Sequence, residues 1–292
     1  MRHGWPNWQG HQKRWNQLHP IPIDYVPKPL PPGFPRLDVS GQKKNNDSSN
    51  TTHYQHNPFV LLATTNSPFI DLTENWLESL RRQCLQYNVT IVCEDLEGYK
   101  YFSRRANDLF HIINSQDFQL PGRFSKLKNF AELIAKRVVY INQLLASGLD
   151  VLLADIDAVW VKDPLPIITD EYSKYDMWVA QGHNETIPCP CFLYMKAVPI
   201  VVNMAEQWVE RISGVNNNET DQIALMHVMK TLPDLRINRL DKVRFPSGRD
   251  FFDPDWYLRN FDQVYVAHGN HQGRHAGKKS KFKEFGIWLL EN

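Results

Sequence analysis

Short apolar runs and amphipathic stretches alternate along the first half of the chain. The runs at 59–66 and 89–93 predict two buried strands, the first of which ends in polar residues. Between them we expect a helix, with Asp71 as its N-cap and Glu74 three positions later in a capping-box pattern. The apolar positions of this helix, at roughly helical spacing, are Leu72, Trp76, Leu77, Leu80 and Leu85. The alternation indicates an α/β fold.

A long helix and a third strand continue this alternation. Helical patches are expected at 101–110, followed by looser sequence. The long helix ends at Gly148 and carries Ile134, Val138, Ile141 and Leu145. A buried strand is then expected at 151–154, which leads into an acidic pair. Strands and helices in this order predict a doubly wound sheet, in which ligands bind beyond the carboxyl ends of the strands.

The second half of the chain is less regular. Two apolar runs there predict strands that we expect to be antiparallel, and three amphipathic stretches predict helices. In chain order the expected elements are strands at 176–180 and 192–195, helices at 202–212 and at 221–230 with Thr220 as cap, a strand at 264–267 that ends at His268, and a helix at 279–290. No internal repeat is visible.

The first 57 residues have a different composition, rich in Pro, His, Asn, Gln and Ser. The segment 41–50 contains no apolar residue at all, so it cannot bury enough surface to fold. We therefore expect residues 1–57 to be a largely disordered stem or linker, and residues 58–292 to form a single folded domain.

Overall composition excludes some classes of protein and leaves the compartment open. The 292 residues carry a formal net charge of +1, which gives no indication of a nucleic-acid partner. Neither a signal peptide nor a membrane span of about 18 apolar residues is present, so any anchor lies upstream or is missing. Five N-glycosylation sequons favour the Golgi lumen over the cytoplasm: Asn46, Asn50, Asn88, Asn184 and Asn218. The pairing of Cys84, Cys93, Cys189 and Cys191 stays open.

The candidate chemistry begins with Asp155 and Asp157, which follow the third buried strand. On an extended backbone, side chains two residues apart share a face. Burying both carboxylates costs several kcal/mol unless their charge is compensated. A divalent cation such as Mn²⁺ or Mg²⁺ suits their oxygen atoms, and the cation would in turn hold a diphosphate. The structural alternative is a strand that ends in a turn, with both carboxylates solvated.

Four separated segments together resemble the nucleotide-diphospho-sugar transferase domain of glycosyltransferase family 77, which includes plant xylosyltransferases that build pectin side chains. The segments are Leu153 to Pro164 with its Asp-x-Asp, Asn218-x-Thr-Asp-Gln222, Phe245-Pro-Ser-Gly248, and His268 with Lys278 and Lys281 to Trp288. The resemblance covers about 58–288. It implies a GT-A fold with a Rossmann-like mixed sheet flanked by helices, a UDP-sugar donor, a metal ion and retention of anomeric configuration.

The resemblance also implies roles for three basic side chains. His268 would be the third metal ligand, although a histidine after an apolar strand is also common in cores. Lys278 would face the diphosphate, or it is a solvated lysine in a basic tail. Arg137 sits where the family has Lys or Arg and would contact the donor, or it forms a structural salt bridge to a strand carboxylate.

The remaining implied site residues would contact the sugar and the nucleotide. Asp221 would bind sugar hydroxyls and Gln222 would face the anomeric carbon; both residue types are also ordinary near a helix start. Thr64, Thr65 and Asn66 would contact the base and ribose, or they form ordinary turn structure after a strand.

Two positions depart from the family pattern. Where members show Asn-Thr-Gly before an aromatic strand, this chain has Pro-Cys-Pro-Cys-Phe at 188–192, and His271 stands where a Trp commonly follows the metal histidine. Both departures leave the sugar and the acceptor undetermined.

The motifs and the resemblance together predict a Mn²⁺-dependent retaining glycosyltransferase that forms an α linkage to a glycan or glycoprotein hydroxyl, with UDP-xylose or UDP-galactose as donor. The alternatives are an inactive binding module, or a zinc hydrolase built on His268, His271 and His275.

Overall fold

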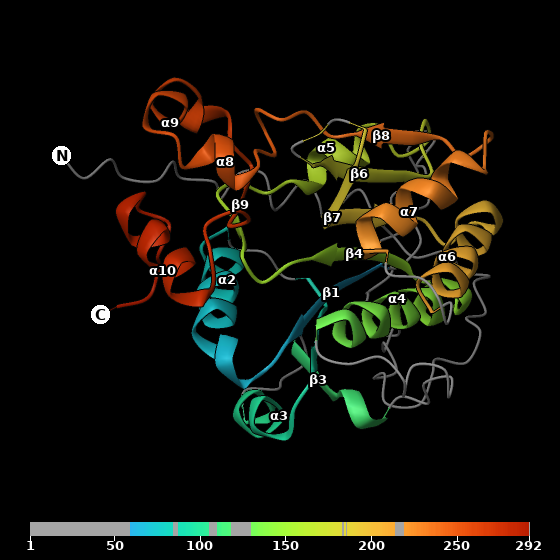
Figure 1. The fold of residues 1–292 in the computed structure, drawn as a ribbon, viewed down its shortest axis with the longest axis horizontal. Helices are drawn as coiled ribbons and strands as arrows, with labels where there is room; N and C mark the ends of the chain where they lie inside the picture. Colours follow the sequence, from blue (N-terminus) through green and yellow to red (C-terminus); the bar gives the residue numbers. More distant parts are fainter. Residues whose placement is uncertain are drawn as a thin grey trace, which may run out of the picture.

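The central feature of the computed structural model is a mixed β-sheet. The structure describes residues 59–83, 87–104, 110–117, 130–182, 184, 186–213 and 219–291. In these ranges the sheet has seven strands in the order β3-β2-β1-β4-β7-β6-β8 (Figure 1). In chain order the strands are β1 Phe59–Thr65, β2 Val89–Cys93, β3 Phe110–Asn114, β4 Asp150–Ala154, β6 Met177–Gln181, β7 Pro188–Met195 and β8 Ile237–Arg239.

The sheet changes direction between two halves. Strands β1 to β4 pair parallel to one another, whereas β7 pairs antiparallel with both β4 and β6, and β8 is parallel to β6. Strand β1 has β2 on one side and β4 on the other, so the chain reverses its winding between β1 and β4. Such a switch point places a crevice at the carboxyl ends of the two strands. The mixed α/β sheet predicted from the sequence is confirmed.

Helices cover both faces of the sheet. On one face α4 Phe130–Ala146, α6 Pro199–Ile212 and α7 Asp221–Lys230 lie side by side (Figure 1). The hydrophobic cluster on the other face contains residues of α2 Ile70–Arg82, α3 Leu96–Ser103 and α5 Leu165–Thr169. Short 3-10 turns are η2 Ser67–Phe69, η3 Ser115–Asp117 and η5 Phe261–Gln263.

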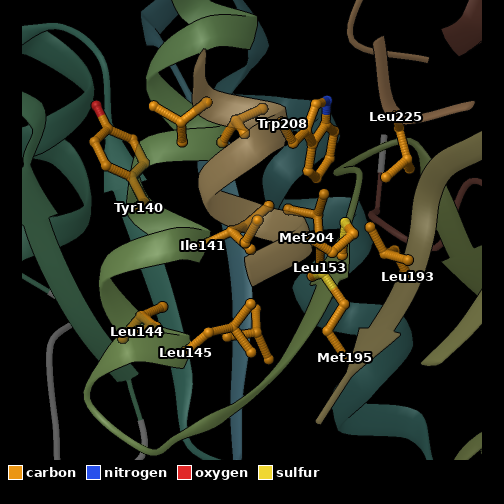
Figure 2. Close-up of a cluster of buried hydrophobic side chains, with 14 of the residues drawn as sticks. Tyr140, Ile141, Leu144, Leu145, Leu153, Leu193, Met195, Met204, Trp208 and Leu225 are labelled. Atoms are coloured by element: carbon orange, nitrogen blue, oxygen red, sulfur yellow. The ribbon is translucent and has the colours of Figure 1, made fainter. Parts of the chain in front are cut away.

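The central strands are apolar throughout because both of their faces are buried. In β4, Val151 and Leu153 pack under the helices α4, α6 and α7, whereas Leu152 and Ala154 belong to the cluster on the opposite face. Figure 2 shows the first of these clusters, in which Trp208 of α6 points toward side chains of the neighbouring helices and strands. This packing fixes β4 firmly, and the acidic pair follows directly at its carboxyl end.

A smaller sheet and the C-terminal helices form a third layer of packing. Strands β5 Ala158–Trp160 and β9 Val266–His268 pair antiparallel. Around them lie α8 Gly248–Phe251, α9 Pro254–Asn260 and α10 His275–Glu284. The buried side chain of Asn75 in α2 donates to the carbonyl of Ile287 at 3.1 Å and accepts from the amide of Leu289 at 2.6 Å. These bonds hold the C-terminal segment against α2.

Several local predictions were wrong. Asp71 is not an N-cap, because α2 begins at Ile70; its carboxylate instead binds Lys279 at 2.7 Å and also contacts His275. Of the expected helix at 101–110, residues 101–103 end α3, residue 110 begins β3, a strand that was not predicted, and 105–109 lie outside the described residues. The last helix is α10 instead of 279–290. The short elements β5, β8, α5, α8 and α9 were missed, because fewer than two turns or four strand residues give no clear periodicity.

Some expectations fall on residues that the structure does not describe. The expected stem at 1–57, the apolar residue Leu85 and Cys84 lie outside the described residues. Within the described part of the chain, none of the helices combines the length and the apolar character that crossing a membrane requires.

One core residue connects the packing to the first turn of α7. Trp208 and Trp178 are both fully buried, but only Trp208 donates its indole N–H, to the carbonyl of Asp221 at 3.0 Å. Trp208→Phe is expected to lower the free energy of unfolding by about 0.5–1.5 kcal/mol more than Trp178→Phe, because of the two variants only Trp208→Phe removes a hydrogen bond. Urea unfolding of both variants measures the difference, and equal losses would contradict it.

Candidate active site

A cleft of about 450 Å³ lies at the carboxyl ends of β1 and β4. It collects side chains from the ends of three strands, from two helix starts, from the middle of α4 and from the turn after β4. All the site residues predicted from the sequence line it: Thr64, Thr65, Asn66, Arg137, Asp155, Asp157, Asp221, Gln222, His268 and Lys278. The structure brings these residues together in one cleft. The role of each residue stays a prediction.

The acidic pair is positioned by a turn, not by an extended strand as the sequence predicted. After β4 the chain turns, and the amide of Ala158 donates to the carbonyl of Asp155 at 2.9 Å. Strand β5 then pairs with β9 so that Ala158 lies opposite His268, and the amide of Gly269 donates to the carbonyl of Asp157 at 2.8 Å. Backbone pairing therefore brings His268 beside two carboxylates that are more than 100 positions earlier in the chain.

The Phe-Pro-Ser-Gly segment supports this arrangement from behind. A Cβ atom added to Gly248 would lie 2.1 Å from the carbonyl oxygen of Asn270 and 2.8 Å from that of His268. The amide of Gly248 also donates to the side chain of Asn270. Only glycine permits this close approach, so Gly248 packs directly against the backbone at the end of β9, where His268 lies.

The ligand atoms of Asp155, Asp157 and His268 lie within 4.8 Å of one another. The Nε2 atom of His268 is 3.4 Å from Oδ1 of Asp157 and 3.7 Å from Oδ2 of Asp155. Lys278, from α10, binds the other carboxylate oxygen of Asp157. Two carboxylates, an imidazole and an ammonium group thus share one wall of the cleft.

Charge compensation controls the protonation of these groups. Burial and the neighbouring Asp157 raise the pKa of Asp155 above its usual value, despite the opposing effect of Arg137. Burial would also raise the pKa of Asp157, but His268 and Lys278 outweigh it and hold that pKa far below the usual range. Burial would lower the pKa of His268, but Asp157 raises it well above its usual value. Asp157 and His268 therefore form a charged pair.

These residues fit a divalent cation. The two carboxylates concentrate negative charge in a largely buried place, and among the residues that the structure describes Arg137, Lys278 and a protonated His268 compensate it. Carboxylate oxygens with one imidazole nitrogen form a ligand set suited to Mn²⁺ or Mg²⁺. A bound ion would take the place of the His268 proton.

Arg137 connects the acidic pair with the start of α7. Its guanidinium binds Oδ1 of Asp155 at 2.7 Å and also binds the carboxylate of Asp221. The Thr220 hydroxyl caps α7 by accepting from the amide of Ile223 at 3.4 Å, as the sequence predicted. The salt bridge that was one of the two predictions for Arg137 is therefore present, and the same residue lines the cleft.

Polar residues at the end of β1 and directly after it also line the cleft. The Thr65 hydroxyl lies 2.6 Å from that of Thr73, so it is used inside the protein. The side-chain oxygen of Asn66 is buried and makes no hydrogen bond among the described residues, which leaves it available to a ligand. Sequence reasoning missed Glu94, another cleft residue; its place after the carboxyl end of β2 was the signal that could have found it.

The three histidines of the zinc-hydrolase alternative are not brought together. His275 contacts Asp71 through Nε2, and His271 has a positive φ of 60° in the loop before α10. Among the described residues, neither belongs to a group of side chains close enough to hold a metal ion. The structure therefore gives no support to a hydrolase built on these residues.

Comparison with known proteins agrees with the fold. The model of the family "Nucleotide-diphospho-sugar transferase" matches residues 84–285. An Arabidopsis thaliana UDP-D-xylose:L-fucose alpha-1,3-D-xylosyltransferase is 24% identical over 81% of this chain and 71% of its own. A Dictyostelium discoideum UDP-galactose:fucoside alpha-3-galactosyltransferase is 21% identical over 82% of this chain, but only 44% of its own length is covered.

Among solved structures, the glycosyltransferase GlyE of Streptococcus pneumoniae TIGR4 superposes with a TM-score of 0.52. The identity is 13%, over 80% of this chain and 62% of that one, so the likeness concerns the fold. The fold and the family match together define an enzyme of the GT-A glycosyltransferase class. The chain belongs to the nucleotide-diphospho-sugar transferase family, as the motifs in its sequence predicted.

Removal of the Arg137 guanidinium should show how strongly the acidic cluster destabilises the fold when its charge is not compensated. Arg137→Met is expected to lower the free energy of unfolding by roughly 3–5 kcal/mol at neutral pH, because a buried carboxylate loses its partner. The deficit should shrink as the pH falls, because the already raised pKa of Asp155 rises further and protonation then removes the charge.

Urea unfolding at about pH 7 and about pH 5 measures both effects. Arg244→Met is the matched control, because Arg244 pairs with Asp241 while about half of its side chain is exposed (47%). Its loss is expected to stay below about 1 kcal/mol at both pH values. An Arg137→Met deficit no larger than that of the control would contradict the assignment.

Proposed function

We propose that this chain is a Mn²⁺-dependent retaining glycosyltransferase that moves a sugar from a UDP-sugar to a hydroxyl of a glycan or glycoprotein. The observation that carries the proposal is the convergence of Asp155, Asp157 and His268 beside Lys278 in one cleft. When bound by these ligands, the metal ion neutralises the charge that develops on the leaving diphosphate.

Different side chains of the cleft would bind the diphosphate, the nucleoside and the sugar of the donor. Lys278 adds a positive charge beside Asp157, where it can pair with the diphosphate. Asn66 offers its unpaired side-chain oxygen at the end of β1, where the base and ribose would lie with Thr64 and Thr65. Asp221, held by Arg137 at the start of α7, would bind sugar hydroxyls.

Retention of configuration requires either a protein nucleophile or attack on the same face that the diphosphate leaves. A nucleophile would have to stand on the far face of the sugar. Asp221 is engaged by Arg137, and the amide of Gln222 is a poor nucleophile. We therefore favour front-face attack, in which the departing diphosphate oxygen takes the proton of the acceptor hydroxyl while Lys278 stabilises its charge.

The relatives suggest the donors to test. The Arabidopsis proteins are named as UDP-xylose-dependent and the Dictyostelium protein as UDP-galactose-dependent, so UDP-xylose and UDP-galactose are our candidate donors. The five sequons favour the Golgi lumen as the compartment. Residues 1–57 would then be a stem, and 58–292 the catalytic domain.

The metal assignment is tested by removing one carboxylate. Asp157→Ala is expected to abolish Mn²⁺-dependent UDP binding, because Asp155 and His268 alone are too few ligands to hold the ion. Isothermal calorimetry with UDP and Mn²⁺ measures the affinity. Asp241→Ala, which removes a half-exposed carboxylate remote from the cleft, should bind as the unchanged protein does. Unaltered affinity in Asp157→Ala would disprove the metal site.

The reaction itself is tested with a panel of UDP-sugars. One donor is expected to be hydrolysed in a Mn²⁺-dependent way, and competitors that differ by one hydroxymethyl group should be disfavoured by about 1–3 kcal/mol. With an acceptor, proton NMR of the anomeric signal should show an α linkage from an α-linked donor. A β linkage would overturn retention, whereas UDP binding without any turnover would favour an inactive binding module.

A further inference from the structure

Two cysteines stand directly behind the oxygen ligands. Cys189 and Cys191 lie in β7, and their side chains share a face because successive residues of a strand alternate. The exposed fraction is 1% for Cys189 and 4% for Cys191, and 8% for His268. The two sulfur atoms and a ring nitrogen of His268 lie within 4.8 Å of one another. Three buried side chains with metal-ligand atoms therefore form a second cluster, and nothing in the proposed reaction uses its thiols.

The ring of His268 stands between the two clusters. Its Nε2 atom faces the carboxylates of Asp157 and Asp155, at 3.4 and 3.7 Å. Its Nδ1 atom faces the other way and lies 3.7 Å from Sγ of Cys189. One imidazole thus offers a nitrogen to a set of oxygen ligands and the other nitrogen to a set of sulfur ligands.

The two sets suit different ions. Carboxylate oxygens prefer hard cations, whereas thiolates with an imidazole prefer Zn²⁺ and related ions, usually with four ligands in a tetrahedron. Space for a fourth ligand exists beside the sulfur set. A cavity of about 10 Å³ borders Cys191 and His268 and is also lined by Ser247 and Gln181. This volume is at the lower limit for one water molecule, which takes roughly 10–15 Å³.

We propose that Cys189, Cys191 and Nδ1 of His268 form a site for a thiophilic divalent cation of the Zn²⁺ type, behind the site for the hard ion. The three groups are buried and converge without any rearrangement of the backbone. Binding would release the protons that the thiols and Nδ1 carry, and water in the adjacent cavity would complete the coordination.

Both ion sites use His268, so an ion in one site affects binding at the other. This coupling rests on the proposed function, whereas the thiophilic site itself does not. A neutral imidazole has one lone pair, because the other nitrogen carries the proton. A cation on Nδ1 therefore leaves a proton on Nε2, which is the atom that the hard ion needs. Two neighbouring dications also repel each other. A bound thiophilic ion is expected to weaken Mn²⁺-dependent UDP binding at least tenfold.

The test uses Cd²⁺ as a probe, because thiolate–Cd²⁺ bonds give a charge-transfer absorption in the ultraviolet. Reduced protein freed of reductant and metal should bind one equivalent of Cd²⁺ with this absorption. Cys189→Ala/Cys191→Ala should lose the signal. Cys84→Ala/Cys93→Ala is the matched control, which removes the other two cysteines of the chain and should keep the signal. Asp157→Asn should also keep it, because its change lies on the Nε2 side.

The outcomes separate the two proposals. Signal retained in Cys189→Ala/Cys191→Ala, or lost only in Cys84→Ala/Cys93→Ala, would overturn the thiophilic site. Thermal unfolding of the metal-free proteins distinguishes a variant that lacks metal ligands from one that does not fold. If Cys189→Ala/Cys191→Ala does not fold, Cys189→Ser alone should weaken Cd²⁺ binding at least tenfold. Failure of Mn²⁺ to support UDP binding would overturn the proposed function and leave the Cd²⁺ result intact. Mn²⁺–UDP affinity unchanged by Zn²⁺ would overturn the coupling.

Discussion

The structure depends above all on how buried negative charge is compensated at the end of β4. Asp155 and Asp157 cannot both be ionised there without positive partners, because desolvation disfavours the charged forms. Arg137, Lys278 and His268 supply these partners from three different elements, α4, α10 and β9. The same charges that make the cluster costly are the ones that, in our proposal, would hold a cation and a diphosphate. Function and local instability therefore have one physical origin.

The architecture explains how these partners meet. The change of winding between β1 and β4 leaves a crevice at the carboxyl edge of the sheet, and the small β5–β9 sheet brings His268 to that edge. The cluster beneath α4, α6 and α7 holds Arg137 and the first turn of α7 in place, with Trp208 bonded to the backbone of Asp221 (Figure 2). A rigid core thus fixes side chains whose mutual repulsion would otherwise separate them.

In our proposal, the two sides of His268 serve two different ions. The Nε2 side faces oxygen atoms and the Nδ1 side faces Cys189, in the segment where the sequence departs from the family pattern. The two thiols are buried beside a histidine and are more than packing residues. The hydrogen bond with Cys191 and the nearby His268 lower the pKa of Cys189 to about 6, although burial opposes this shift. The sequence departure therefore lies at the proposed thiophilic site and not at a distant surface.

The sequence by itself determined three strands of the parallel half of the sheet, β1, β2 and β4, the helices α4, α6 and α7, and the identity of many cleft residues, because long apolar runs and short motifs are local signals. Only the tertiary structure decided how those residues meet. The pairing of Ala158 with His268 and the double contact of Arg137 depend on residues far apart in the chain. The position of the cysteines behind His268 depends on the same long-range pairing, since β7 reaches the site only by lying beside β4.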